Sequence, residues 1–278
     1  MRRLLPFLLA GCCAVAQAES RAALNDLAYG PAPEQRLDLY RPAGPAAAPL
    51  LLMVHGGAWQ YGDKAATGVV GRKQGRWLPR GIAVASANYR LLPAAPPLDQ
   101  ARDVALALAQ LQRRAGELGL DGDSVVLLGH SAGGHLIALL AARPDLLAAA
   151  GARPPLGFVV LDSGALNVPA IMHGPHLPLH DRAFGNDPDY WLAISPHDQL
   201  RHASAPLQLV CSSLRRHSCG QAEAFAARAR NLGGRAEVLA LPLSHGDINT
   251  RLGDDPAYTA AVERFLATLS PRLAERLR

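Results

Sequence analysis

Short apolar stretches alternate along the chain with longer segments whose apolar residues recur at helical spacing. Continuous apolar runs of strand length predict buried strands over residues 49–54, 82–87, 124–128, 157–161, 207–210 and 236–241. Apolar residues at helical spacing predict helices over residues 99–118, 132–142, 221–232 and 256–269. The alternation predicts an α/β fold with a mostly parallel central sheet and helices on both faces.

Two stretches depart from this alternation. Residues 37–40 alternate apolar and polar side chains, which predicts an antiparallel strand at an edge of the sheet. Residues 168–200 are rich in His, Pro, Asp and aromatic residues, and we expect an irregular lid over the carboxyl edge of the sheet. The chain has no internal repeat, low-complexity tract or linker, so residues 19–278 are expected to form a single domain.

Residues 1–18 are typical of a secretory signal peptide. Arg2 and Arg3 form a basic start, residues 4–10 form a short apolar stretch, and residues 16–18 form a small-x-small cleavage site. The apolar stretch is too short to span a bilayer, so the sequence predicts no membrane span. Cleavage after Ala18 predicts a periplasmic or secreted protein. The alternative is a lipoprotein, because residues 9–12 resemble a lipobox that would place a lipid anchor on Cys12.

Charge and cysteine content narrow the classes of partner. The formal net charge is +5, and it becomes +3 (26 basic against 23 acidic residues) once Arg2 and Arg3 leave with the signal. The basic residues are scattered, so nucleic-acid binding has no support. No His/Cys cluster has the spacing of a zinc site, so no metal is expected. In an oxidising compartment Cys211 and Cys219 predict a disulfide that closes a short loop, the alternative being two free buried thiols.

The pentapeptide GHSAG, residues 129–133, lies between a predicted buried strand and a predicted helix. A serine on such a sharp turn has a strained backbone, which the flanking glycines permit, and its hydroxyl is exposed above the sheet. The helix amino terminus behind it favours developing negative charge. This context predicts that Ser131 is a nucleophile, while His130 is expected to be packed or hydrogen-bonded.

Acyl transfer also needs donors for an oxyanion and a base for the serine proton. The sequence HGGAW, residues 55–59, ends an earlier strand, so the N–H groups of Gly57, Ala58 and Ala132 are predicted to form the oxyanion hole. His245 follows the last predicted strand, where the chain order of nucleophile, acid and histidine places the base.

These segments resemble α/β-hydrolases of the esterase and lipase branch related to hormone-sensitive lipase, close to the bacterial feruloyl-esterase-like group. The resemblance extends from about Leu37 onward and rests on HGGAW (55–59), ANYRL (87–91), GHSAGGH (129–135), AFG (183–185), SP (195–196) and HGDIN (245–249). It implies the α/β-hydrolase fold and hydrolysis of a small-molecule carboxylic ester through an acyl-enzyme, without a cofactor. Relatives also cleave amides, so an amidase such as an arylformamidase is the alternative.

The acid of the site departs from the family pattern. Relatives usually carry an Asp in the loop after the strand at 207–210, but residues 211–219 contain no carboxylate. Three interpretations stay open: the acid has moved to Asp162, a Ser131–His245 dyad works without an acid, or the fold is a non-catalytic binding protein of the envelope. Under the first, the Asp162 carboxylate is expected within hydrogen-bond reach of His245 Nδ1. Asp162 could otherwise cap the following turn.

The remaining site residues concern the substrate. The loop at 211–219 is expected to brace the site wall, with Arg215 in solvent or facing an anionic substrate group. Trp59 and His217 are predicted to bind substrate. Further candidates for a pocket are lid residues that are as often found in a core: His173, His176, Tyr190 and Trp191.

Overall fold

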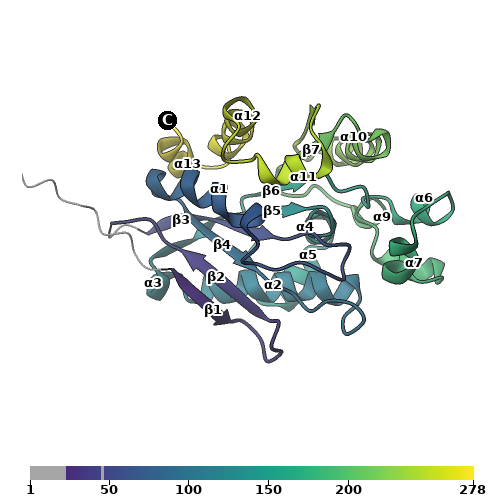
Figure 1. Ribbon diagram of the computed structural model, residues 1–278, viewed down its shortest axis with the longest axis horizontal. Coiled ribbons are helices and arrows are strands. Elements are labelled where there is room, and N and C mark those ends of the chain that lie inside the picture. The colour runs from purple at the N-terminus through teal and green to yellow at the C-terminus, as the bar shows by residue number, and fades with distance from the viewer. Residues whose placement is uncertain (1–22, 45–46) are drawn as a thin grey trace, which may run out of the picture.

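The computed structural model describes residues 23–44 and 47–278 and contains one eight-stranded sheet (Figure 1). The predicted signal peptide, residues 1–18, and Cys12 lie outside the described residues. The strand order is β1-β2-β4-β3-β5-β6-β7-β8. The bounds are β1 Leu24–Ala28, β2 Arg36–Tyr40, β3 Ala48–Val54, β4 Ala83–Ala87, β5 Leu120–His130, β6 Gly157–Leu161, β7 Leu207–Ser212 and β8 Ala236–Leu241.

All pairs from β4 to β8 across the sheet are parallel, and β2 pairs antiparallel with both β1 and β4. The predicted mostly parallel sheet is therefore confirmed. The expectation that residues 37–40 form an edge strand is wrong, because β1 lies outside β2. Strand β1 was not predicted, because its residues are exposed or half-buried and form no continuous apolar run.

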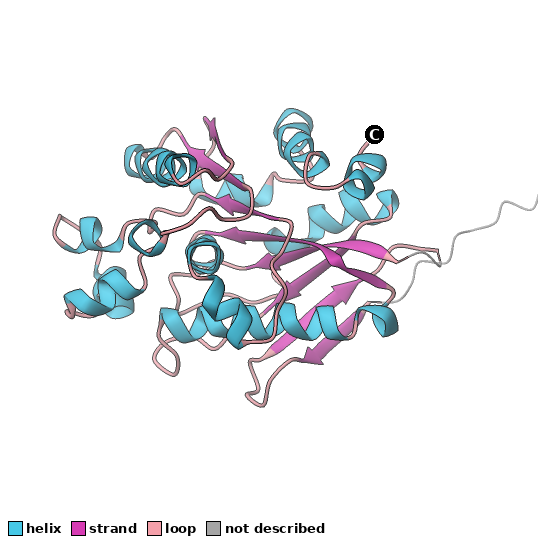
Figure 2. Cartoon of the chain, turned by 180° about the vertical axis from the view of Figure 1, so that it is seen from behind, coloured by secondary structure: helices cyan, strands magenta, loops and turns pink. Residues whose placement is uncertain are grey.

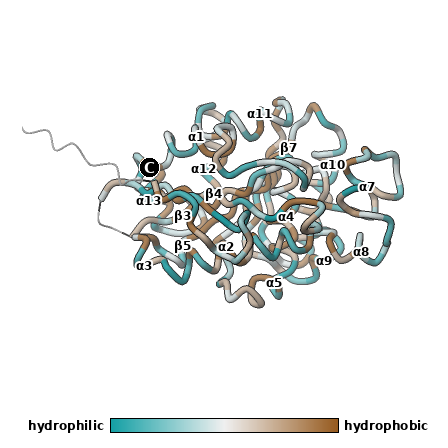
Figure 3. The backbone as a smooth tube through the Cα atoms, turned by 60° about the horizontal axis from the view of Figure 1, so that its bottom comes forward, coloured by the Kyte–Doolittle hydropathy of each residue, from teal (hydrophilic) through white to brown (hydrophobic). Residues whose placement is uncertain are grey.

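Helices cover both faces of the sheet (Figure 2). Side chains of β3 alternate between the faces: Leu50 and Leu52 pack on the side of α2, α4 and α10, whereas Leu51 and Met53 pack on the side of α1, α12 and α13. Apolar residues are concentrated along the central strands and along α4, which is buried throughout (Figure 3). These helices are α1 Thr67–Trp77, α2 Pro97–Arg113, α4 Ala132–Ala142, α10 Arg216–Asn231, α12 Pro256–Ala267 and α13 Pro271–Arg276, with the shorter α3 Ala115–Leu118, α5 Pro144–Ala149 and α11 His245–Thr250.

Strand β3 is the switch point of the sheet, because the chain continues from it to β4 on one side and returns to β5 on the other. The segment after β3 contains HGGAW, and the turn after β5 contains Ser131. In open α/β sheets, the carboxyl ends of strands at such a point form the crevice that binds ligands. The topology therefore brings the two predicted halves of the acyl-transfer site to one edge.

The segment at 168–200 is not irregular as expected but forms four short helices, α6 Val168–Met172, α7 Pro178–Phe184, α8 Pro188–Ala193 and α9 Pro196–Gln199. Each of them has Pro at its first or second position, where a missing N–H costs nothing. The prolines that suggested irregular structure therefore mark helix starts. Among the described residues, no helix is long and apolar enough to cross a membrane.

Candidate active site

Ser131 occupies a strained turn between β5 and α4. Its φ of 55° and ψ of −116° lie in a region that a residue with a side chain rarely adopts. The turn closes tightly: a Cβ atom on Gly129 would lie 2.4 Å from the Gly133 carbonyl oxygen, and one on Gly133 would lie 2.3 Å from that of Val54. Both glycines of the pentapeptide are therefore required by close backbone approach, as the sequence predicts.

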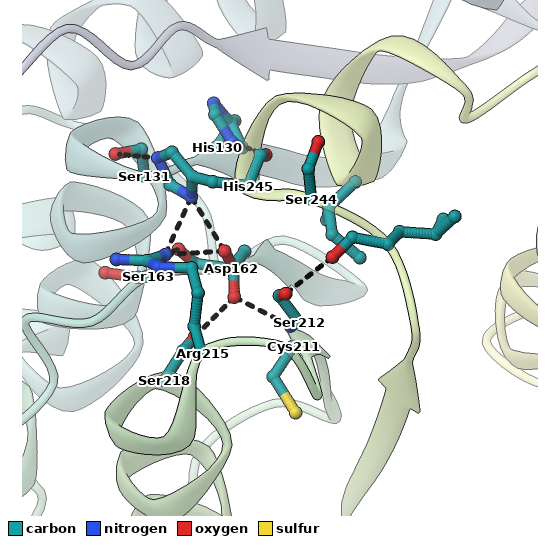
Figure 4. Close-up of polar contacts among 12 residues, drawn as sticks. His130, Ser131, Asp162, Ser163, Cys211, Ser212, Arg215, Ser218, Ser244 and His245 are labelled. Atoms are coloured by element: carbon teal, nitrogen blue, oxygen red, sulfur yellow. Dashed lines mark hydrogen bonds and ion pairs between the residues drawn. The ribbon is translucent and has the colours of Figure 1, made fainter.

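His245 connects Ser131 to Asp162 (Figure 4). Its Nε2 lies 3.0 Å from Ser131 Oγ, and its Nδ1 lies 2.7 Å from Asp162 Oδ2. Asp162 directly follows β6 and has a φ of 49°, so nucleophile and carboxylate each project from a left-handed residue at a strand end. The expected distance between Asp162 and His245 is confirmed, and a simple turn cap does not describe this carboxylate.

Asp162 is fully buried and accepts several hydrogen bonds. The Ser212 N–H donates to Oδ1 at 2.8 Å, the Ser218 hydroxyl also donates to Oδ1, and Arg215 Nη1 donates to Oδ2 at 2.5 Å. Burial alone would raise the pKa of the Asp162 carboxyl, but the hydrogen bonds from His245, Ser212, Ser218 and Arg215 lower this pKa well below its ordinary value. The carboxylate is therefore ionised at neutral pH.

Arg215, which was expected in solvent or facing an anionic substrate group, is ion-paired with Asp162, and its side chain stays 42% exposed. A contact with an anionic substrate group stays a prediction. Its Nη1 also lies 2.7 Å from His245 Nδ1 and 3.4 Å from the Asp162 carbonyl oxygen. His245 Nδ1 donates to Asp162 Oδ2 when it carries the imidazole proton and can accept from Arg215 only when it does not, so these two contacts are alternatives. The tautomer with the proton on Nδ1 leaves Nε2 free to accept a proton from Ser131.

The segment that contains two of the predicted oxyanion donors approaches the nucleophile. A Cβ atom on Gly56 would lie 2.9 Å from the Ser131 Cβ, so the HGGAW segment approaches the serine closely. Gly57, Ala58 and Trp59 have successive φ values of 127°, 52° and 60°. The Ala132 N–H is the first of α4 and has no partner within that helix. The HGGAW segment lies beside the nucleophile, and the role of the Gly57, Ala58 and Ala132 N–H groups in binding an oxyanion stays a prediction.

Trp59 links the HGGAW segment to α4 and α7. Its indole is 3% exposed, contacts Phe184 with ring centroids 4.8 Å apart, and donates from Nε1 to His135 Nδ1 at 3.1 Å. His135 Nε2 in turn donates to the Ile194 carbonyl oxygen at 2.8 Å. Burial lowers the pKa of His135 to about 4, so this histidine is neutral at physiological pH. The burial of Trp59 favours a packing role over direct substrate binding.

Two further histidines, His130 and His217, were considered in the sequence. His130 Nε2 donates to the His245 carbonyl oxygen at 2.9 Å, which confirms the expectation of a hydrogen-bonded histidine at this position. Burial, with the neighbouring His245, lowers the pKa of His130 to about 3. His217 lies exposed in the first turn of α10, and its contact with a substrate stays a prediction.

Sequence reasoning missed the polar contacts of Ser212, Arg215 and Ser218 with Asp162. A usable signal existed, since all three lie in the loop where relatives carry the acid. Within residues 23–44 and 47–278, no group of three or more His, Cys, Asp or Glu side chains could hold a metal ion.

A family model described as BD-FAE matches residues 37–148. Over 120 residues the chain is 38% identical to a probable isoprenylcysteine alpha-carbonyl methylesterase of Oryza sativa subsp. japonica. This aligned segment covers 43% of this chain and 28% of that protein. Over 115 residues the chain is 36% identical to esterase LipC of Mycobacterium tuberculosis, and this aligned segment covers 40% of this chain and 28% of that protein. The chain thus spans less than a third of the length of these curated relatives.

Among solved structures, the apo form of Thermogutta terrifontis esterase 2 matches with a TM-score of 0.73 and 22% identity, covering 91% of this chain and 96% of that one. This likeness extends over nearly the whole chain, well beyond the segment that the family model matches. Sheet order, nucleophile turn and structural likeness agree with the resemblance inferred from the motifs. The chain therefore has the α/β-hydrolase fold, and the relatives that it matches are named as esterases.

Proposed function

We propose that this protein hydrolyses a carboxylic ester of a small molecule through an acyl-enzyme formed on Ser131. The observation that carries the proposal is the hydrogen-bonded line from Ser131 Oγ through the His245 ring to the buried Asp162 carboxylate. Hydrolases of this fold use such a line to activate a serine that is otherwise a poor nucleophile.

The reaction follows from the geometry. Ser131 Oγ attacks the acyl carbon while His245 Nε2 takes its proton, and the carbonyl oxygen becomes an oxyanion that the N–H groups of Gly57, Ala58 and Ala132 stabilise. When the bond to the alcohol breaks, His245 returns the proton to the leaving oxygen. Water then attacks the acyl-enzyme by the same route, releasing the acid and free Ser131. Asp162 holds the Nδ1–H tautomer and stabilises the imidazolium.

Two other readings are weaker. An amidase, such as an arylformamidase, would use the same groups, but the names of the curated relatives favour an ester. A non-catalytic binding protein of the envelope would have no use for a strained serine at φ 55° hydrogen-bonded to a histidine and a buried carboxylate. No step in the proposal requires a cofactor.

A substrate panel tests the proposal. p-Nitrophenyl esters of increasing acyl length, aryl esters and an aryl formamide are assayed with the wild-type protein and with Ser131→Ala. We expect ester turnover that the variant reduces about 10⁴-fold or more without loss of fold. Turnover of the formamide alone would establish the amidase, and equal ester rates for both proteins would exclude Ser131 as nucleophile.

We propose further that residues 19–278 form one exported domain. The disulfide between Cys211 and Cys219 supports this, because such bonds persist in oxidising compartments. Intact-mass analysis of protein from the native cell envelope should give a chain that begins near Glu19 and takes up alkylating reagent on Cys211 and Cys219 only after reduction. A mass increase from a lipid on Cys12 would instead indicate a lipoprotein that is anchored to the membrane.

A further inference from the structure

Three of the four side-chain or backbone groups that donate to the Asp162 carboxylate come from one short segment, residues 212–218. Ser212 and Ser218 donate to Oδ1, and Arg215 donates to Oδ2 (Figure 4). The fourth donor is His245 itself. The loop in which relatives usually carry the acid has no carboxylate here. It supplies instead the hydrogen bonds to the Asp162 carboxylate at the end of β6.

A disulfide closes this same segment. Cys211 lies in β7 and Cys219 lies in α10, with their Cα atoms 5.1 Å apart across eight positions of sequence. The bond fixes the end of the strand beside the first turn of the helix. Because Ser212 follows one cysteine and Ser218 precedes the other, the closed loop brings both donors to the same oxygen of Asp162.

The segment also holds the loop that carries the base. The Ser212 hydroxyl donates to the Leu243 carbonyl oxygen at 2.5 Å, and the Ser213 N–H donates to that of Leu241 at 2.8 Å. Leu243 lies two residues before His245. The disulfide-closed loop therefore contacts both the Asp162 carboxylate and the segment that leads to His245.

We propose that the disulfide-closed segment 211–219 is a positioning device for the displaced acid, with Arg215 and Ser218 as its positioning residues. A buried carboxylate needs charge-assisted donors to stay ionised and in one orientation. Loss of these donors leaves Asp162 free to turn away from Nδ1 or to take up a proton. This inference rests on the proposed function where it concerns turnover, but its geometric part does not.

Variants of the segment test the inference in the full-length oxidised protein. Ser218→Ala and Arg215→Gln each remove one donor, and Arg215→Lys keeps the charge. Ser213→Ala is the matched control, because Ser213 lies in the same loop with an exposed side chain that makes no contact with Asp162. Circular dichroism establishes that each variant is folded at the assay temperature.

Turnover of p-nitrophenyl acetate gives the first readout. We expect Ser218→Ala and Arg215→Gln to lower kcat about 10- to 100-fold, the effect of one hydrogen bond to a charged group, with KM changed by less than about threefold. Arg215→Lys should recover part of the loss, and Ser213→Ala should stay within about twofold of wild type. Wild-type kcat in Ser218→Ala and Arg215→Gln would overturn the inference, as would an equal loss in Ser213→Ala.

The second readout is the downfield proton resonance of the His245 Nδ1–H bonded to Asp162, assigned by its disappearance in His245→Gln. It should broaden or move upfield in Ser218→Ala and Arg215→Gln and stay unchanged in Ser213→Ala. This signal does not depend on turnover. A wild-type protein that shows the resonance but hydrolyses no ester or amide would contradict the proposed function and leave the positioning role to be decided by the variants' spectra.

The disulfide itself is tested with Cys211→Ala/Cys219→Ala and, independently, with wild-type protein treated with a phosphine reductant. We expect both to lower kcat about tenfold, with KM nearly unchanged, because a misplacement of about 1 Å costs up to ~10²-fold in rate. Reoxidation should restore the reduced wild type. Unchanged kcat and an unchanged His245 Nδ1–H resonance in fully reduced, folded protein would overturn the positioning role of the disulfide.

Discussion

Ser131 and Asp162 have backbone conformations that differ from those of the strands before them. Each directly follows a buried parallel strand, and each has a positive φ, 55° and 49° respectively. Such conformations cost energy and persist where the surrounding structure imposes them. In both cases this backbone conformation turns the side chain toward His245. The strained turns thus place Ser131 and Asp162 in hydrogen-bond contact with the imidazole.

Asp162→Asn tests the displaced acid at this scale. The amide can donate a proton to His245 Nδ1 and thereby favour the tautomer in which Nε2 carries a hydrogen, which cannot accept one from Ser131. We expect kcat to fall about 10⁴-fold with the fold intact, as in serine proteases that lose this contact. Steady-state kinetics with a p-nitrophenyl ester measures the loss, and a nearly normal kcat would favour a Ser131–His245 dyad.

The sequence was sufficient to single out Ser131 and His245 and to offer Asp162 as one of three interpretations of the acid, because chain order and strand ends determine which loops share an edge. It was not sufficient for Arg215. An arginine in an apparently exposed loop has a solvated side chain by default, and its contact with Asp162 depends on a disulfide-closed backbone path that spacing alone does not determine. The burial of Trp59 was also not predictable, since it depends on how residues 168–200 pack.

Among the elements, the strands and helices with strong apolar patterns were predictable to within a few residues, and α4, β6 and β8 have the predicted bounds. Helix α1 was missed because its sequence contains three glycines and few apolar residues. It forms because Val69, Val70 and Trp77 are buried against the sheet, a tertiary effect that local pattern does not reveal.

His135 is a buried hydrogen-bond bridge between Trp59 and the end of α8, which gives a prediction at this scale. Replacing His135 by Leu leaves the Trp59 indole N–H and the Ile194 carbonyl oxygen without their buried partners. We expect the free energy of unfolding to fall by about 2–4 kcal/mol, from two unsatisfied polar groups. Urea denaturation measures it; a loss below about 0.5 kcal/mol would mean that water or repacking satisfies both groups.

For the molecule as a whole, a buried lysine couples stability to pH. Lys73 in α1 is 1% exposed, and its Nζ donates to the carbonyl oxygens of Asn249 at 2.7 Å and Gly68 at 3.3 Å. Burial, with a smaller effect from Arg72, lowers the pKa of Lys73 from 10.5 to about 7. The folded protein therefore binds this proton less tightly than the unfolded chain does.

Between pH 7 and 10.5 the unfolded chain retains the Lys73 proton while the folded protein loses it, so stability rises with pH in this window. We expect the wild-type free energy of unfolding to increase by about 3 kcal/mol from pH 6 to pH 9.5, at about 1.4 kcal/mol for each unit above pH 7. In Lys73→Met this increase should disappear, with a more stable protein at pH 6. Urea denaturation at both pH values measures it, and an equal rise in both proteins would assign it to other groups.

The central claim is that Ser131 is a nucleophile activated by His245 and Asp162. Incubation of folded wild-type protein with a fluorophosphonate, followed by peptide mapping by mass spectrometry, tests it most directly. The account predicts a single covalent adduct on Ser131, which is absent in Ser131→Ala and forms at least about 10³-fold more slowly in His245→Ala. A folded protein without an adduct, or an adduct on another serine that persists in Ser131→Ala, would contradict it.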